Sequence, residues 1–542
     1  MFEGLLKKLD EISSSQLAKT LTYIGALFFL VLFILVPPIL GISLKINLVG
    51  QVFSDPALFA RAKSAIFYSF AIAFSVAALD VILALPMAWY IARGESRWKD
   101  IMDSLTDIPF IIPTVALGFS TLLFWGNTGP LTVLGISFQP GLILVLLLHF
   151  AFSYPVIVRV MVGELLAYNS IFETAAKTLG ARSFTIARTV TLPLLRPGLV
   201  AAFLLAFARS LSETGATLMV AGAFENGPVF IKNAKDAGLE GPMVLVSFSL
   251  IIFSITVFAL IRYFGTRVKL PINRVLPSFE TRLSSKNALN LRNGATMAVF
   301  AFFVMIPSIF ITLPTITAVA DGTLNAAISG QGIWGEYWQA MGNSYMIGAL
   351  ATLINIVTGL PVAILVARKR MGKLGTTILD AAVNIPIVVP SIALGVSLSF
   401  FWGSFGFLPE FWIIVFAHTT ITYTYFVQAM AAAIEGIPEE MEETARTLGS
   451  KPLTVFRRII VPLTKYSIFS GAILTFTRSV GETGATTAVS NTVKTAPVLL
   501  VSWVKQTVPA TTSDIALGIA ILVLTSFVSL LILRLIIYRR GD

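Results

Sequence analysis

RSLSETGAT, at residues 209–217, returns 269 residues later as RSVGETGAT at residues 478–486. The two histidines of the chain, His149 and His418, coincide at the same offset. Upstream the offset becomes 277, and the Ile-Pro, Pro and Ala-Leu-Gly residues between 108 and 118 match those between 385 and 395. Self-similarity at a fixed spacing is typical of a repeat architecture. The chain is therefore predicted to consist of two homologous halves.

The composition is that of a membrane protein. Of the 542 residues, 56% are hydrophobic and 12% are charged, whereas about 25% of an average soluble domain is charged. A single aqueous core stops growing at about 250–300 residues, so lipid must cover much of this apolar surface. The net charge of +11 lies in short segments between apolar runs, so it indicates membrane topology rather than a nucleic-acid partner. The absence of cysteine excludes disulfides, thiolate nucleophiles and Cys-ligated metal sites.

Twelve apolar runs are long enough to cross a bilayer, which takes about 20 helical residues. They lie near residues 21–42, 65–92, 105–125, 141–162, 195–222 and 243–264, and then near 295–318, 344–367, 378–402, 411–430, 464–488 and 514–537. We predict an all-α integral membrane protein of about twelve transmembrane helices, with a first half at residues 1–280 and a second at 281–542. Because each half has an even number of spans, the halves should be related by an axis along the membrane normal, with the pore between them.

Basic residues orient these spans, because short cytoplasmic loops are enriched in Lys and Arg. Such residues gather after the second and eighth spans, at 93–99 and 368–373, and near the C-terminus. We therefore predict a multi-pass protein of the cell membrane with both termini in the cytoplasm. The first run lacks a small-residue cleavage site, so it is expected to be an anchor helix rather than a removed signal.

A long polar loop joins the fourth and fifth spans of each half, at residues 163–194 and 431–463. Residues 173–180 read ETAAKTLG and residues 442–449 read EETARTLG, and in both copies a proline follows the glycine by thirteen positions. This pattern predicts a short amphipathic helix that ends at its glycine, with a proline near the start of the next span. Such a helix could lie in a groove of a cytoplasmic partner; the alternative is an ordinary basic loop.

These loops resemble the EAA loop of the permease family of binding-protein-dependent ABC importers, which has Glu-Ala-Ala, a Gly four residues later and a downstream Leu-Pro pair. The chain departs from that pattern at Thr174, Thr444 and Val461. In this family the loop is a coupling helix that docks on the nucleotide-binding subunit, so the resemblance implies two copies of an ABC ATPase subunit. ATP and Mg²⁺ are expected on that partner, because this chain has no G-x-x-x-x-G-K-[ST] phosphate loop. The resemblance assigns ATPase coupling to Glu173, Ala175, Ala176, Leu179, Gly180, Pro193, Glu443, Ala445, Leu448, Gly449 and Pro462.

Ionisable residues inside spans are costly and therefore functional candidates. Arg209 and Glu213 are four residues apart in the fifth span, as are Arg478 and Glu482 in the eleventh, which puts each pair on one helical face. The small residues that follow let backbones approach closely, and the segment is similar to one that lines the pathway in molybdate, tungstate and sulfate permeases. We predict a gate at Arg209, Glu213, Thr214, Gly215, Arg478, Glu482, Thr483 and Gly484. The alternative is that each Arg-Glu pair only clamps its own half.

Two other polar sites are interpreted as structural. Two histidines are too few ligands for a metal site, so we expect no metal, and we interpret His149 and His418 as hydrogen-bonded packing residues. Asp80 aligns with Asn355 at an offset of 275. A neutral amide therefore serves at the matching position, and we expect a buried hydrogen bond there rather than a charge relay.

Together these features predict the permease of an ABC importer that works by alternating access. An external substrate-binding protein would deliver the substrate, and ATP hydrolysis on the partner subunits would drive the pore; the chain itself would be no enzyme and carry no cofactor. The preferred substrate is a small inorganic oxyanion (molybdate, tungstate, sulfate or phosphate), ahead of ferric iron and thiamine, whose fused permeases also resemble this chain. A secondary transporter of six plus six spans shares the parallel repeat but does not account for the paired loops. A membrane-embedded enzyme lacks a recognisable nucleophile and base.

Overall fold

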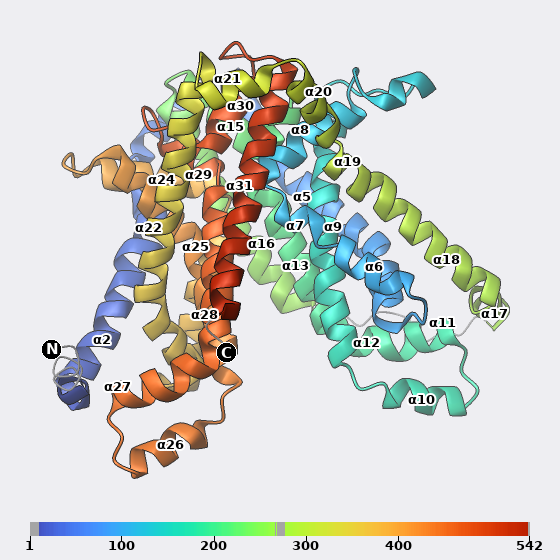
Figure 1. Ribbon diagram of the computed structural model, residues 1–542, viewed down its shortest axis with the longest axis vertical. Coiled ribbons are helices and arrows are strands. Elements are labelled where there is room, and N and C mark those ends of the chain that lie inside the picture. The colour runs from blue at the N-terminus through green and yellow to red at the C-terminus, as the bar shows by residue number, and fades with distance from the viewer. Residues whose placement is uncertain (1–9, 266, 268–276, 540–542) are drawn as a thin grey trace.

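The computed structural model describes residues 10–265, 267 and 277–539, and in these ranges the chain is helical, with no β-strand (Figure 1). The helices before residue 266 are α2 Gln16–Phe29, η1 Leu30–Leu35, α3 Val36–Ser43, η2 Ile46–Val49, α4 Gly50–Phe53, α5 Pro56–Arg93, α6 Trp98–Leu105, α7 Ile108–Ile111, α8 Thr114–Trp125, η3 Pro130–Leu134, α9 Leu142–Ala167, α10 Ile171–Thr178, α11 Ser183–Ile186, η4 Ala187–Thr191, α12 Leu192–Leu194, α13 Arg196–Ser212, α14 Gly215–Val220, α15 Gly227–Asp236 and α16 Glu240–Gly265. Those after residue 276 are α17 Pro277–Leu283, α18 Lys286–Val299, η5 Phe300–Met305, α19 Ile306–Ile309, α20 Thr312–Ala320, α21 Thr323–Ser329, α22 Ile333–Ala367, α23 Gly372–Val388, α24 Ser391–Gly403, α25 Glu410–Glu435, α26 Glu439–Thr447, α27 Pro452–Val455, η6 Phe456–Ile460, α28 Val461–Val480, α29 Gly484–Val489, α30 Ala496–Val504 and α31 Thr512–Arg539.

Eight of the described helices are long and apolar enough to cross a membrane, and ten if each of two sharply bent pairs counts as one span. The expected span at 105–125 falls short because Pro109 and Pro113 divide it among α6, α7 and α8. The expected span at 411–430 lies in α25, which is long enough, but its threonines between Thr419 and Thr424 make it more polar. The all-α membrane architecture is confirmed.

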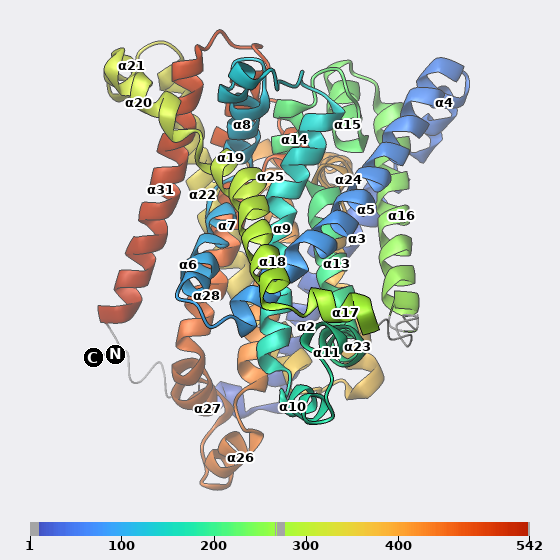
Figure 2. The same ribbon diagram turned by 90° about the vertical axis from the view of Figure 1, so that its right-hand side faces the viewer.

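The two halves exchange their first helices. The α2–α3 segment packs on α22 and α24 of the second half, and the matching segment α18–α19 packs on α5 and α8 of the first (Figure 2). Equivalent serines fasten both contacts: Ser397 Oγ donates to the Pro37 carbonyl, and Ser120 Oγ donates to the Pro307 carbonyl. Each hydroxyl also accepts from an N–H of the same segment, from Ile42 at 3.0 Å and from Ile311 at 2.9 Å, so each serine bridges two backbone groups in the first helical segment of the other half. The division at residue 280 stays a prediction.

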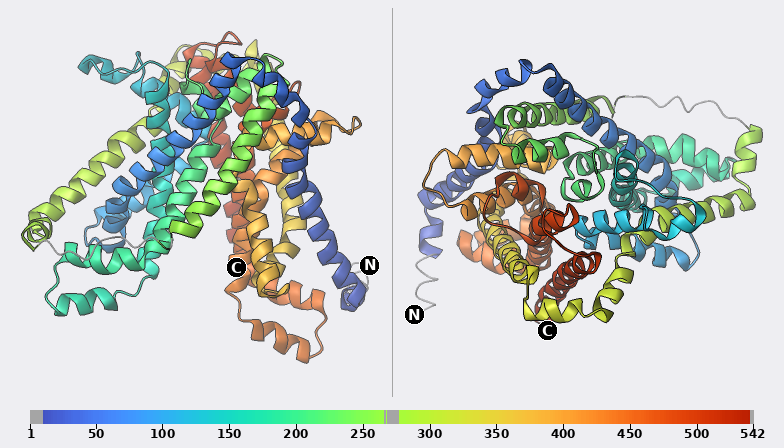
Figure 3. Two further views of the ribbon diagram at one scale, coloured as in Figure 1. Left: turned by 180° about the vertical axis from the view of Figure 1, so that it is seen from behind. Right: turned by 90° about the horizontal axis from the view of Figure 1, so that it is seen from above.

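The molecule is closed at one end and divided at the other. The halves meet where α15 and α30 lie and diverge toward α10 and α26, like two arms (Figures 1 and 3). The start of α2 and the end of α31 lie at the divided end as well. The ends of the two halves that carry α10 and α26 therefore lie further apart than the ends that carry α15 and α30 (Figure 1).

Candidate functional site

The two polar loops carry the expected short helices. α10 and α26 protrude at the divided end (Figure 1), and each stops at a glycine with a left-handed backbone, Gly180 at φ +83° and Gly449 at φ +86°. In each copy the residue after the glycine donates its N–H to the carbonyl five positions back, at 3.0 Å. This arrangement is a Schellman motif, which favours glycine. The predicted helix stop is thus confirmed in both copies.

The tips of α10 and α26 expose apolar side chains. Leu179 is 88% exposed and Leu448 is 81% exposed, and both stand directly before the left-handed glycines. Ala175 is exposed, while Ala176 and Ala445 are half-buried. Each protruding helix thus ends in an exposed leucine.

A buried glutamate anchors each of these helices to the body. Glu173 accepts a hydrogen bond from Thr191 Oγ1 at 3.0 Å, and Glu442 pairs with Arg368 at 2.7 Å. Glu443, which the sequence favoured, is exposed. Glu442 was missed although it lies at the repeat offset from Glu173. Pro193 and Pro462 lie in the first turn of α12 and α28, after π-helical turns. The coupling roles of these residues remain predictions.

The segments expected to form continuous spans at 195–222 and 464–488 are broken. α13 ends at Ser212, and α28 ends at Val480; the short helices α14 and α29 then begin at Gly215 and Gly484. Each break is held by its glutamate: Glu213 Oε1 accepts from the Ala216 N–H and Glu482 Oε1 from the Ala485 N–H, both at 3.1 Å. A carboxylate at a helix N-terminus satisfies an unpaired N–H and the helix dipole. These glutamates therefore cap α14 and α29 and lie beyond the helices that carry their arginines.

The two broken segments cross each other at glycines. A Cβ built on Gly215 would lie 2.5 Å from Thr483 Oγ1, and one built on Gly484 would lie 2.7 Å from Thr214 Oγ1. Such distances exclude any side chain at either position without movement of the backbone. Of the predicted residues, Thr214 and Gly215 thus contact Gly484 and Thr483 of the other half in a reciprocal contact. Their role as a gate remains a prediction.

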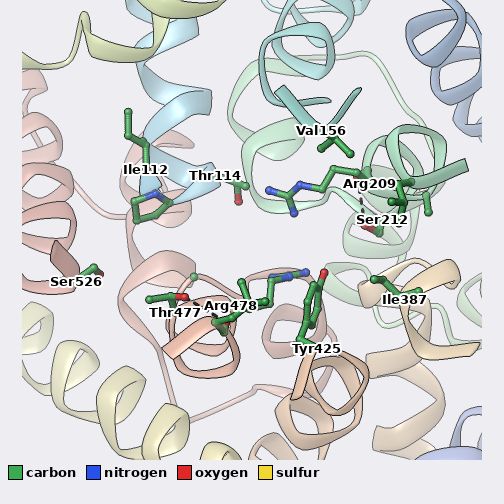
Figure 4. Close-up of a pocket in the computed structure, with 15 residues that line it drawn as sticks. Ile112, Thr114, Val156, Arg209, Ser212, Ile387, Tyr425, Thr477, Arg478 and Ser526 are labelled. Carbon is green, nitrogen blue, oxygen red and sulfur yellow. Dashed lines mark hydrogen bonds between the residues drawn. The ribbon is translucent and has the colours of Figure 1, made fainter. Parts of the chain in front are cut away.

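A cavity of about 300 Å³ lies beside this crossing and takes its lining from both halves (Figure 4). Arg209 and Thr114 line it from the first half, and Arg478, Tyr425 and Thr477 line it from the second. Both arginines precede the breaks in α13 and α28, so the cavity lies on the α10 and α26 side of the crossing. The structure therefore places two guanidinium groups in one chamber between the halves.

A family profile matches the chain twice. The family described as binding-protein-dependent transport system inner membrane component matches residues 81–270 and 359–540. The chain belongs to this family. The match to both halves confirms the resemblance inferred from the polar loops, and with it the two-repeat membrane architecture.

Named relatives of this inner membrane component are permease proteins. The molybdenum transport system permease protein ModB of Mycobacterium tuberculosis is 39% identical over 149 residues, 27% of this chain and 56% of the relative. The sulfate transport system permease protein CysT of Salmonella typhimurium is 31% identical over 175 residues, 28% of this chain and 62% of the relative. The molybdate/tungstate transport system permease protein WtpB of Methanocaldococcus jannaschii is 29% identical over 213 residues, 38% of this chain and 82% of the relative. The chain thus spans less than two thirds of the first two relatives.

The histidines of this inner membrane component brace the breaks. His149 Nδ1 bonds Ser210 Oγ at 2.7 Å and its Nε2 bonds Thr217 Oγ1 at 2.9 Å. His418 makes the equivalent bonds to Ser479 and Thr486, both at 2.8 Å. Each imidazole therefore joins the helix before the break to the helix after it. Both ring nitrogens are engaged, which confirms the packing interpretation.

Asp80 and Asn355 occupy equivalent buried sites. Ser153 Oγ donates to Asp80 Oδ2, and Asn355 Nδ2 donates to Thr422 Oγ1 at 2.8 Å. Ser153 and Thr422 are themselves separated by the repeat offset. Either a carboxyl or an amide therefore fits the same position.

We expect Asp80→Asn to leave the thermal stability almost unchanged, within about 1 kcal/mol, because Asn355 shows that an amide satisfies this site. Asp80→Ala should cost about 1–3 kcal/mol, because it removes a buried hydrogen-bond partner of Ser153. Thermal unfolding in detergent with a fluorescence readout compares the two variants. Equal losses in both would contradict a purely hydrogen-bonding role.

A lysine that the sequence gave no reason to single out joins the halves at the closed end. Lys235 Nζ on α15 donates to the carbonyls of Thr487, at 2.7 Å, and Ser490, where α29 ends. Burial lowers the pKa of Lys235 to about 8, below the value of about 10.4 for an exposed lysine. If Lys235 becomes exposed when this end opens, its ammonium group loses a proton on closing at any pH between these two pKa values.

The ratio of closed to open protein at this end should therefore increase as the pH rises from 8 to about 10.4, by up to about tenfold for each pH unit. Below pH 8 the lysine is charged in both arrangements, so we expect no dependence there. The distance between spin labels at Asn233 and Asn491, followed by pulsed EPR from pH 7 to 10, measures the closed fraction. Lys235→Met should abolish the dependence; a dependence that persists in this variant would assign it to another group.

Proposed function

We propose that this chain is the permease of an ATP-driven importer for a small inorganic oxyanion. The observation that carries the proposal is the cavity between the halves, which Arg209 and Arg478 line together. A charge at the centre of a membrane costs about 2.5–3.5 kcal/mol or more. Two guanidinium groups in one chamber lower that cost for an anion and raise it for a cation.

The position of the cavity suits a translocation pathway. Glycines close the space on one side of it, at Gly215 and Gly484, and the arms diverge on the other side (Figure 3). We infer that the structure represents the inward-facing state of an alternating-access cycle, with α10 and α26 in the cytoplasm. The molybdenum, sulfate and molybdate/tungstate systems named for the relatives support an oxyanion over ferric iron or thiamine.

ATP hydrolysis would be supplied by a partner. The sequence has no phosphate loop, and the exposed Leu179 and Leu448 stand at two protruding tips. Each tip would dock in a groove of one ABC ATPase subunit, which would hold ATP and Mg²⁺. A substrate-binding protein would dock at the closed end, which faces outward in this arrangement.

Purification of the tagged chain from its own membrane tests this assembly. We expect native mass spectrometry in mild detergent to find two ATPase subunits for each chain. A chain that purifies without an ATPase, and whose uptake follows an ion gradient, would instead be a secondary transporter.

A further inference from the structure

The two arginines of the cavity occupy equivalent positions but differ in their pairing. Arg478 Nη1 lies 2.6 Å from Glu482 Oε2, a close ion pair. Arg209 Nη1 lies 3.8 Å from Glu213 Oε2, beyond hydrogen-bond distance. The glutamates do not cause the difference, because both cap the following helix with the same 3.1 Å bond. The asymmetry therefore belongs to the arginine side chains.

Two neighbouring substitutions between the repeats account for it. Tyr425 lines the cavity beside Arg478, with its hydroxyl facing that guanidinium (Figure 4), whereas the equivalent position beside Arg209 is Val156. The Arg209 guanidinium lies 5.3 Å from the ring centroid of Phe152. The equivalent residue of the second half is Ile421. A guanidinium over an aromatic face is attracted to it by the electrostatic field of the ring. Arg209 thus packs on an aromatic ring where the second half has Ile421, and Arg478 lies beside a hydroxyl where the first half has Val156.

We propose that the cavity binds one oxyanion and that Arg209 contacts it, while Arg478 serves to hold Glu482 and the gate. This proposal rests on the proposed function and assigns unequal roles to the two halves. Arg478 is already paired with Glu482 at 2.6 Å, so a bound anion would have to compete with that carboxylate. Arg209 can offer its fork of N–H donors to two oxygens of an anion at less cost, a geometry that guanidinium groups favour.

The remaining lining fits a small, multiply charged anion. Hydroxyl groups of Thr114 and Tyr425 line the same chamber and can donate to further oxygens, whereas those of Ser212 and Thr477 already donate to helix carbonyls. The N-terminal end of α8 also borders it at Thr114, which adds the positive end of a helix dipole. A volume of about 300 Å³ is at the small end of ligand cavities.

The test compares variants of the whole importer in proteoliposomes, with radiolabelled tungstate as the probe. Arg209→Gln should lower ATP-driven uptake at least about tenfold, equivalent to about 1.4 kcal/mol of lost stabilisation, with an unfolding temperature near that of the unmodified complex. Arg209→Lys keeps the charge and should recover most of the rate. Arg478→Gln should instead lower the unfolding temperature, because it leaves Glu482 buried without its partner, and Glu482→Gln in addition should restore it.

A second pair of variants keeps every charge in place. Val156→Tyr supplies the hydroxyl that the second half has, so it should draw Arg209 toward Glu213 and lower uptake. Val156→Phe fills the same volume without the hydroxyl and should transport faster than Val156→Tyr. Equal uptake by Val156→Tyr and Val156→Phe, or undiminished uptake in Arg209→Gln, would overturn the role of Arg209 while leaving the proposed function intact. No oxyanion uptake by the unmodified complex would overturn both.

Discussion

Replacing Gly180 and Gly449 together with Arg should reduce ATP-driven uptake about a hundredfold, a loss equivalent to about 2.8 kcal/mol. Both glycines have left-handed backbones and stand at exposed tips where an added Cβ meets nothing within 4 Å. The membrane-spanning part should therefore stay folded, apart from about 1–2 kcal/mol of local backbone strain at each tip. A long charged side chain there would prevent the close docking of an ATPase. Uptake and thermal unfolding, measured on the same preparation, separate the two effects.

The matched control is the double substitution of the same glycines by Asn. Asparagine tolerates the left-handed conformation and is short, so this variant should retain most of the uptake. Undiminished uptake in the double Arg variant would show that α10 and α26 are not the docking elements. Equal losses in the Asn and Arg variants would point to backbone strain instead of blocked docking.

Gly215→Val with Gly484→Val should open the crossing between α14 and α29. Each new side chain would overlap a threonine of the other half, since even a Cβ lies within 2.7 Å of that residue. Overpacking of a tight contact costs about 1–3 kcal/mol, and two such sites should disfavour the closed arrangement by about 30-fold or more. Because the chain has no cysteine, a cysteine pair at Asn233 and Asn491, beside the contact of Lys235 with Ser490, would report closure through the yield of a bifunctional cross-linker without background.

We expect the cross-linking yield to fall sharply in the double Val variant, together with loss of coupled uptake. Gly163→Val is the control, because a Cβ at Gly163 in α9 meets nothing within 4 Å. A double Val variant with normal cross-linking and normal uptake would remove Gly215 and Gly484 from the gate.

The sequence predicted the helical membrane architecture because hydropathy reports burial in lipid directly. It placed spans well where the apolar run is continuous, as in α5 and α16. It did not predict the breaks after Ser212 and Val480, because the glutamate that caps each following helix reads as a charge within an apolar run. The exchange of α2 and α18 between the halves was also out of reach, since hydropathy does not encode which helices pack together.

The repeat was the strongest guide to the candidate site. It marked Arg209 and Arg478, Gly215 and Gly484, which the structure brings together. The repeat did not reveal the difference between the surroundings of the two arginines. The alignment was found from identical residues, so the replacement of Tyr425 by Val156 at the equivalent position was not considered. Lys235 was missed for a physical reason: its partners are backbone carbonyls, which leave no trace in the side-chain pattern.

The most direct test of the account is uptake into proteoliposomes that contain this chain, its copurifying ATPase and its binding protein, against tungstate, molybdate, sulfate, phosphate, ferric iron and thiamine. The account predicts uptake of an oxyanion that requires ATP on the side of the membrane where the ATPase subunits lie. This uptake should stop when ATP is replaced by a non-hydrolysable analogue. Uptake of ferric iron or thiamine alone, or oxyanion uptake that persists without ATP hydrolysis, would contradict it.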